Sequence, residues 1–346
     1  MPFRLFWWTI ILPTILLSNN SSFPGHENAS YSLMQSNNSS FPGHENASYS
    51  LTLDVEAGKI HVVSWMDCLD LRLFAVLINS TISSSRSPER VHFHFFIPEG
   101  QEKKLSYYKL KVLFPDSNLE MIGQKEVKEK LRVSFDGRHL WSSLLGIKPF
   151  IISTVYPNLS KFIYVTPDVI MKGRVEELFK IDLETHAIAA VEDCSKRLSS
   201  SVNFNVLDAV QRSADKPWVS RSPYKRDACV PDMRVLLINA NNLAGGKIVQ
   251  AVQWWDNVLN GGNDRSEETS PAILLTLYNK YLKLDSGWNV TAEFAPSGHE
   301  DDAKILHFDG PKRVCSEADS KPAQETHYGN LWRQYMPPSS DRILGD

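Results

Sequence analysis

Short runs of β-branched and aromatic residues recur along the chain, and most are separated by segments with helical spacing. The runs cover residues 59–65, 91–97, 118–122, 161–165, 187–193 and 234–240. Residues 69–82 and 249–260 place apolar side chains at intervals of three and four, as amphipathic helices do. Strands that alternate with helices usually form one mostly parallel sheet with helices on both faces. The sequence therefore predicts an α/β fold.

The overall composition supports a large folded domain and disfavours one class of partner. Of 346 residues, 42% are apolar, which is enough to fill a sizeable core. The formal net charge is −3, and the Lys and Arg residues are scattered along the sequence. Nucleic-acid binding is therefore disfavoured.

The first eighteen residues have the pattern of an export signal. Arg4 precedes an uncharged run from Leu5 to Leu17, which Pro13 interrupts and which is short for a membrane-spanning helix. No cleavage site with small residues follows the run. Residues 1–18 therefore predict either a cleaved signal peptide or a short membrane anchor, and both lead into the secretory pathway.

A tandem duplication follows the signal. Residues 19–36 recur almost unchanged as residues 37–54, and Asn, Ser, Gly and Pro dominate both copies. Such a composition cannot bury a core, so we expect a disordered stem over residues 19–54. Six of the nine Asn-x-Ser/Thr sequons lie in it, which predicts a glycosylated stem. Residues 55–346 are then the luminal domain.

The four cysteines match no zinc-binding pattern. They are Cys68, Cys194, Cys229 and Cys315. In an oxidising compartment we expect one structural bridge, with Cys194 and Cys229 as the candidate pair. Four buried free thiols are the alternative.

Carboxylates stand at or shortly after the ends of three of the predicted strands. They are Asp67, Asp168 and Asp193. Ligands of α/β sheets bind beyond the carboxyl ends of the strands, where these side chains would emerge. Asp168 follows Pro167 and has two interpretations, a turn or helix-cap residue and a ligand of a divalent metal.

Seven segments occur in a fixed order between residues 59 and 335. They are HVVSWMDCLDLR, PERVHFHFFIPEG, KFIYVTPDVIMKGRVEELF, AIAAVEDC, MRVLLINANNL, SPAILLTLYNKYLKLDSGWNV and AKILHFDGPKR. In this order they resemble the family 8 glycosyltransferases, above all the plant galacturonosyltransferase-like branch and its animal relatives with a family 8 domain.

This resemblance implies a GT-A fold and an enzyme of the Golgi lumen or a secreted one. Its implied reaction is the retaining transfer of a hexose from a nucleotide-sugar donor, UDP-linked, to a glycan or cell-wall polysaccharide acceptor. The implied cofactor is Mn²⁺, which neutralises the leaving diphosphate.

The resemblance also implies roles for individual residues. The family's two metal-binding Asp residues fall on Thr166 and Asp168, so one carboxylate is missing and Thr166 would act only through a water. The late metal-binding His falls on His307. The donor's diphosphate would be contacted by residues of the same late motif, namely Gly310, Lys312 and Arg313.

Other positions depart from the family pattern. Asp67 is retained as a nucleotide contact, but Asp70 replaces the aromatic residue that stacks on the base. Ile152 replaces a donor-binding Arg, and Arg234 replaces a Gly that lets the backbone approach the sugar. An alternative reading follows, an inactive relative that binds carbohydrate or serves as a scaffold subunit beside an active transferase.

Two further groups of residues have open interpretations. Trp288 and Asn289 either shape the acceptor side of the site or, for Trp288, pack in the core. His92 and His94 share one strand face, as metal ligands would, although histidines of the core or sheet edge are expected there. The sequence contains no Gly-x-Ser-x-Gly or His-Glu-x-x-His motif, which disfavours a hydrolase.

Overall fold

The computed structural model describes residues 58–100, 103–134, 147–243, 247–259, 270–291, 302–308 and 331–344. The chain divides into two compact units, Met1–Ser48 and Tyr49–Asp346, and all described residues belong to the second. The expected signal and stem lie outside the described residues. Within the described part, no helix combines the length and apolarity needed to cross a membrane.

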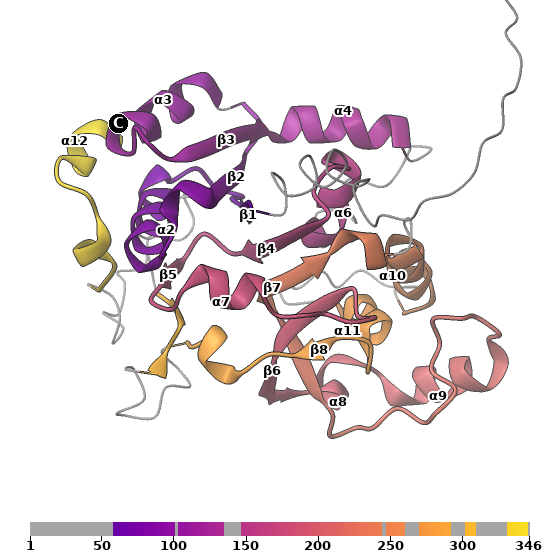
Figure 1. Ribbon diagram of the computed structural model, residues 1–346. Helices are drawn as coiled ribbons and strands as arrows, with labels where there is room; N and C mark the ends of the chain where they lie inside the picture. Colours follow the sequence, from indigo (N-terminus) through magenta and orange to yellow (C-terminus); the bar gives the residue numbers. More distant parts are fainter. Residues whose placement is uncertain are drawn as a thin grey trace, which may run out of the picture. The chain divides into compact units, whose positions relative to one another are not determined.

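A seven-stranded sheet with the order β3-β2-β1-β4-β7-β6-β8 forms the centre of the second unit (Figure 1). Its strands are β1 (Ile60–Trp65), β2 (Val91–Ile97), β3 (Asn118–Gly123), β4 (Lys161–Val165), β6 (Ile188–Arg197), β7 (Cys229–Asn239) and β8 (Leu282–Lys283). Strand β7 is antiparallel to both of its neighbours, and the other pairs in the sheet are parallel. The six predicted strands and the mostly parallel sheet are confirmed.

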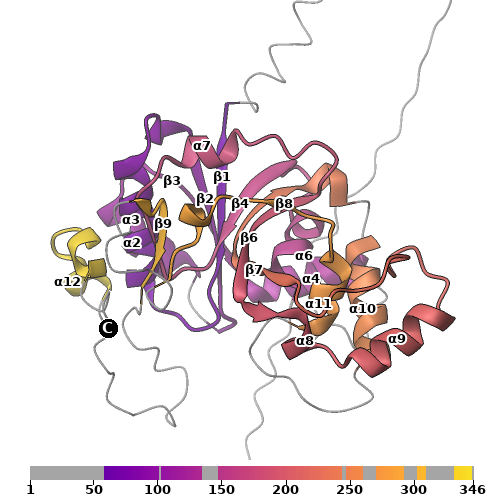
Figure 2. The same cartoon turned by 90° about the horizontal axis from the view of Figure 1, so that it is seen from below.

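Helices cover both faces of this sheet (Figures 1 and 2). One face carries α2 (Leu71–Ser84), α3 (Lys103–Leu113), α7 (Val175–Phe179) and α12 (Ser340–Leu344). The other carries α4 (Gln124–Ser134), α6 (Lys148–Val155), α8 (Leu198–Ser201), α9 (Phe204–Ser213), α10 (Lys247–Leu259) and α11 (Pro271–Leu277). The predicted α/β layering is therefore confirmed.

Alternation along the strands divides the core into two clusters. In β1, Ile60 and Val62 join the cluster under α2, whereas Val63 and Trp65 join the cluster under α6. Successive side chains of a strand point to opposite faces, so a sheet covered on both sides needs apolar residues at nearly every position. This explains why the predicted strands are continuous apolar runs.

A disulfide joins β6 to β7 at one end of this pair. The Cys194 and Cys229 sulfurs are 1.98 Å apart, which confirms the expected pairing. Cys68 is also disulfide-bonded, and Cys315 lies outside the described residues. Free thiols, the alternative drawn from the sequence, are absent from the described part of the chain.

Candidate functional site

A two-stranded sheet brings Asp168 and His307 together. Strand β5 (Val169–Met171) continues from β4 and pairs antiparallel with β9 (Ile305–His307). The Phe308 amide donates a hydrogen bond to the Asp168 carbonyl at 3.1 Å. As a result, the His307 Nδ1 atom lies 3.8 Å from the Asp168 Oδ1 atom. The two residues that the resemblance assigned to one site are neighbours.

The Asp168 carboxyl group is held in its ionised form. Burial alone would raise its pKa, but the His307 imidazole and the Thr166 hydroxyl stabilise the carboxylate, so the pKa of Asp168 lies well below its usual range. Both ring nitrogens of His307 and the Thr166 hydroxyl are buried, and none of the three makes a hydrogen bond of ordinary length to a described residue. Buried polar groups without a close partner are rare, and these belong to the two residues that act on the Asp168 carboxylate, so a polar ligand bound there would satisfy them.

Asp67 lies at the same edge of the sheet. Its carboxylate accepts a hydrogen bond from the ammonium of Lys148, the first residue of α6. Burial, together with the charges of Asp67 and Asp168, raises the pKa of Tyr164 in β4. Since both carboxylates act on this one tyrosine, the ends of β1 and β4 form a single acidic edge.

Strand β7 brings an Asp232–Arg234 pair to this edge. The Thr166 amide donates to the Arg234 carbonyl at 2.9 Å, which places Arg234 opposite Thr166 across the β4–β7 pair. Asp232 Oδ1 accepts from the Arg234 amide at 2.9 Å and from its Nε at 3.0 Å, and Oδ2 pairs with Nη2. Burial opposes the charge of Arg234, but Asp232, Asp168 and Asp193 outweigh it and raise the pKa of the guanidinium.

A cavity of about 720 Å³ opens beside this pair. Its lining includes two cationic side chains, Arg234 and Lys304, and five carboxylates, namely Glu192, Asp193, Asp232, Asp285 and Asp302. Asn289 and Thr291 also line it, and the Asn289 amide and the Thr291 hydroxyl are buried with no hydrogen-bond partner among the described residues. Carboxylates, amides and hydroxyls are groups that bind the hydroxyls of a sugar, so the cavity suits a carbohydrate.

The structure places four of the residues named from the sequence at this edge. Asp168 and His307 are neighbours, Thr166 acts on the Asp168 carboxylate, and Asp67 and Asp168 both act on Tyr164. Gly310, Lys312 and Arg313 lie outside the described residues.

Three of the positions noted in the sequence have structural roles. Asp70 caps α2, because its Oδ1 accepts from the Arg72 amide at 3.0 Å. Ile152 is fully buried in α6. Trp288 is 3% exposed and packs in the core under α2, as the structural interpretation expected.

The sequence pointed to Arg234 only as a departure from the family pattern, and it did not point to its pairing with Asp232. The spacing itself was the signal for this pair, because residues two apart in a strand share a face. Nothing in the spacing indicated that Arg234 would lie opposite Thr166.

A divalent metal fits the residues around Asp168 poorly. Such an ion gains affinity from the number of charged oxygen ligands around it. Of the carboxylates at this edge, Asp67 is paired with Lys148 and Asp232 with Arg234. This leaves the Asp168 carboxylate, the His307 imidazole and the neutral Thr166 hydroxyl as ligands among the described residues, while the Arg234 guanidinium lies opposite Thr166. This set is short of ligands and already contains a cation.

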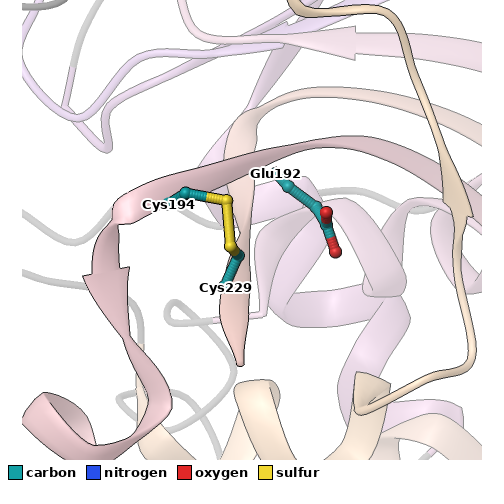
Figure 3. A group of neighbouring side chains, drawn as sticks. All are labelled: Glu192, Cys194 and Cys229. Carbon is teal, nitrogen blue, oxygen red and sulfur yellow. A yellow bond between two sulfur atoms is a disulfide. The ribbon is translucent and has the colours of Figure 1, made fainter. Parts of the chain in front are cut away.

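A second group of potential metal ligands is also excluded. Glu192, Cys194 and Cys229 lie within 4.8 Å of one another, but Figure 3 shows the two cysteines joined through their sulfur atoms. A disulfide offers no thiolate to a metal. Glu192 accepts a hydrogen bond from the Tyr281 hydroxyl at 2.9 Å and pairs with the Lys283 ammonium at 2.9 Å. The group is structural.

Comparisons of the sequence identify related proteins. The profile described as "Glycosyl transferase family 8" matches residues 28–313. "Probable galacturonosyltransferase 6" of Arabidopsis thaliana is 23% identical over 277 residues, which cover 76% of this chain and 45% of that protein. "Probable galacturonosyltransferase-like 4" of the same plant is 22% identical, with coverage of 81% and 79%. The chain thus spans less than half of the first relative and most of the second.

Solved structures with the same fold are glycosyltransferases. The galactosyltransferase LgtC, in complex with donor and acceptor sugar analogs, gives a TM-score of 0.53 at 14% identity and covers 82% of this chain and 100% of that one. The WbbM bifunctional glycosyltransferase gives 0.54 at 13% identity, with coverage of 83% and 51%. These similarities confirm the expected GT-A fold.

Proposed function

Because this chain belongs to glycosyl transferase family 8, we propose that it transfers a hexose from a UDP-linked donor to a glycan or cell-wall polysaccharide, with retention of the anomeric configuration. The observation that carries the proposal is the convergence of Asp168, His307 and Arg234 at the carboxyl edge of the sheet, beside an open cavity. In α/β sheets this edge is where ligands bind.

The residues at the carboxyl edge of the sheet suit both parts of such a reaction, the departure of the diphosphate and the binding of the sugar with its acceptor. When the bond between the sugar and the diphosphate breaks, negative charge grows on the leaving phosphate oxygens and needs cations and N–H or O–H donors around it. Arg234, Thr166 and His307 provide such groups. The cavity beyond them, with Asp193 and Asn289, is the proposed place of the sugar and its acceptor.

The Mn²⁺ ion that the family resemblance implies would be held by Asp168 and His307, with Thr166 contributing through a water. It would supply positive charge to the leaving diphosphate. Since the described residues fit this ion poorly, we assign no step of the reaction to it.

The cellular setting follows from the first 54 residues. We propose that the chain works in the lumen of the secretory pathway, in the Golgi or after secretion, with residues 1–18 as a signal or membrane anchor. Clustered sequons in residues 19–54 support this setting. Association with a second transferase is part of the alternative role as a scaffold subunit.

Donor binding and transfer test this function directly. The purified luminal protein is incubated with a panel of UDP-sugars and an acceptor glycan array, and the product's anomeric configuration is read by NMR. We expect Asp168→Asn to lower transfer on the order of 100-fold, because its carboxylate positions His307 in the site. The exposed Asp116, in the loop between α3 and β3, supplies the matched control Asp116→Asn. A chain that binds no UDP-sugar would be a scaffold subunit instead.

A further inference from the structure

We propose that the Arg234 guanidinium, held in place by Asp232, replaces a divalent metal as the cation that binds the donor's diphosphate, so that donor binding is independent of metal. This inference rests on the proposed function of the same site. In it, Arg234 binds the diphosphate and Asp232 holds the guanidinium in position.

The first support is the position of Arg234. Because Val165 pairs with Val235 in the β4–β7 register, Thr166 pairs with Arg234, and their backbones share a hydrogen bond of 2.9 Å. Residues opposite each other in an antiparallel pair have their Cβ atoms about 5 Å apart on the same face. The guanidinium therefore projects from the residue directly beside Thr166, the position at which the family pattern has a metal-binding Asp.

The second support is the balance of charge. At these two facing positions the chain has a neutral hydroxyl and a cation, Thr166 and Arg234. A metal site needs carboxylates and no cation at such positions, because negative charge attracts the metal ion and a guanidinium repels it. At these two positions an anion is favoured over a cation, since the Arg234 guanidinium is in place before the ligand arrives and keeps its charge beside the carboxylates of Asp232, Asp168 and Asp193.

The third support is the hydrogen-bonding capacity of Arg234. Asp232 engages the Nε and Nη2 atoms and fixes the plane of the guanidinium. The Nη1 atom has no hydrogen-bond partner among the described residues, and the side chain is 38% exposed and lines the cavity. A planar, oriented guanidinium matches the geometry of phosphate oxygens.

The fourth support is the group of unpartnered donors beside Arg234. The Thr166 hydroxyl and the His307 imidazole are buried, and neither makes a hydrogen bond of ordinary length to a described residue. The Asp168 Oδ1 atom lies 3.8 Å from Nδ1 of His307, which leaves Nε2 for a ligand. Phosphate oxygens would satisfy Thr166, His307 and Arg234 together, which no apolar ligand would do.

Calorimetric titration of the luminal protein with UDP, in EDTA and separately in Mn²⁺, tests this inference. We expect the wild-type protein to bind UDP equally well in both solutions. Arg234→Gln should weaken UDP binding in EDTA by about tenfold or more, since charge-assisted hydrogen bonds to phosphate are lost. The exposed Arg212 of α9 supplies the matched control, and Arg212→Gln should bind UDP as the wild type does.

Two further variants guard against a folding defect. Arg234→Gln leaves the Asp232 carboxylate without its partner, so the double variant Asp232→Asn/Arg234→Gln removes both charges and should show the same loss of UDP affinity with a normal melting temperature. The double variant Thr166→Asp/Arg234→Gly places a second carboxylate beside Asp168 and removes the cation. We expect its UDP binding to become dependent on Mn²⁺.

Two results would overturn the inference, and they differ in what they imply for the proposed function. If wild-type UDP binding disappears in EDTA and Arg234→Gln binds as the wild type does in Mn²⁺, a metal is the cation and the transferase proposal stands. If the wild type binds neither UDP nor UDP-sugars in either solution, both proposals fail.

Discussion

Ile152 lies where the family resemblance places a donor-binding arginine, and its side chain is fully buried in α6. It packs in the cluster under α6 together with Phe150 and Val155. The side chain at this position therefore contributes to the core and has no access to a donor. A charged group placed here would lose its hydration without gaining an ionic partner.

Restoring the family's residue should therefore destabilise the protein. We expect Ile152→Arg to lower the free energy of unfolding by more than about 3 kcal/mol, measured by urea denaturation. The control Ile152→Val should cost only about 1 kcal/mol, because it deletes one buried methyl group. If Ile152→Arg were as stable as the wild type and bound UDP more tightly, position 152 would face the donor and the buried assignment would be wrong.

His61 belongs to a chain of polar contacts on the α6 side of the sheet. Its Nδ1 lies 2.9 Å from the His94 Nε2 atom, and the His94 Nδ1 lies 2.9 Å from a Glu120 carboxylate oxygen. Burial, followed by the charges of His94 and His92, lowers the pKa of His61 to about 4. The cluster agrees with the expectation of core or edge histidines for His92 and His94.

This lowered pKa predicts a dependence of stability on pH. The unfolded chain takes up a proton on His61 near its ordinary pKa of 6.5, whereas the folded chain does so only near 4. The contribution of the neutral His61 side chain to the free energy of unfolding is therefore fully present above about pH 6.5. It is lost as the pH falls toward 4. We expect the melting temperature to fall over this range, and less steeply in His61→Gln than in His186→Gln, a histidine outside the cluster. Parallel curves for all three proteins would contradict the assignment.

The Glu176 side chain connects helix α7 to the C-terminal end of helix α2. Although it lies in α7, its Oε1 atom accepts from the backbone amides of Arg86 at 2.8 Å and Ser87 at 3.0 Å, and from the Ser85 hydroxyl. Ser85 is the C-cap of α2, so one buried carboxylate fixes the end of α2 against α7. Hydrogen bonds from neutral donors to a charged acceptor are among the stronger ones in proteins.

Neutralising this carboxylate should loosen the contact between the two helices. We expect Glu176→Gln to lower the free energy of unfolding by about 2 kcal/mol, because its amide accepts less strongly and brings N–H groups to donors. Thermal unfolding measures the effect. Glu177→Gln in the same helix removes only a half-exposed pair with Arg174, 3.5 Å long, and should change stability by less than about 0.5 kcal/mol. Equal effects of the two variants would show that the Glu176 contacts are not formed.

Elements that follow from local pattern were predictable, and those that depend on distant partners were not. The strand over residues 161–165 was recognised because it is a continuous buried run. Strands β5 and β9 have three residues each, too few for a period, and exist because they pair with each other. The antiparallel direction of β7 could not be predicted either, since an apolar run carries no information about strand direction.

The same distinction holds for the site. Asp168 and His307 could be brought together only through the family resemblance, because local spacing cannot relate two residues on distant segments. The proximity of Arg234 to Thr166 depends on the β4–β7 register, which neither the resemblance nor the spacing supplied. The chemistry of the site therefore follows from tertiary pairing more than from any single motif.

For the whole molecule, both core clusters are built from residues between Ile60 and Leu344. The sheet, the helices on its two faces and the Cys194–Cys229 bridge belong to this part of the chain. Its core is of the size expected for a large single domain. The duplicated residues 19–54 have a composition that adds little apolar surface to it.

The duplicated stem should therefore be dispensable for folding. We expect the protein without residues 19–54 to melt within a few degrees of the same protein with them, when both are expressed in a secretory host and compared by calorimetry. Six sequons in 36 residues explain the expectation, because glycans attached there need solvent and could not be accommodated against a packed core. Enzymatic removal of the N-glycans from the longer protein controls for their own effect on stability. If the truncated protein melted much lower than the deglycosylated one, residues 19–54 would have to pack against the domain and contribute to its core.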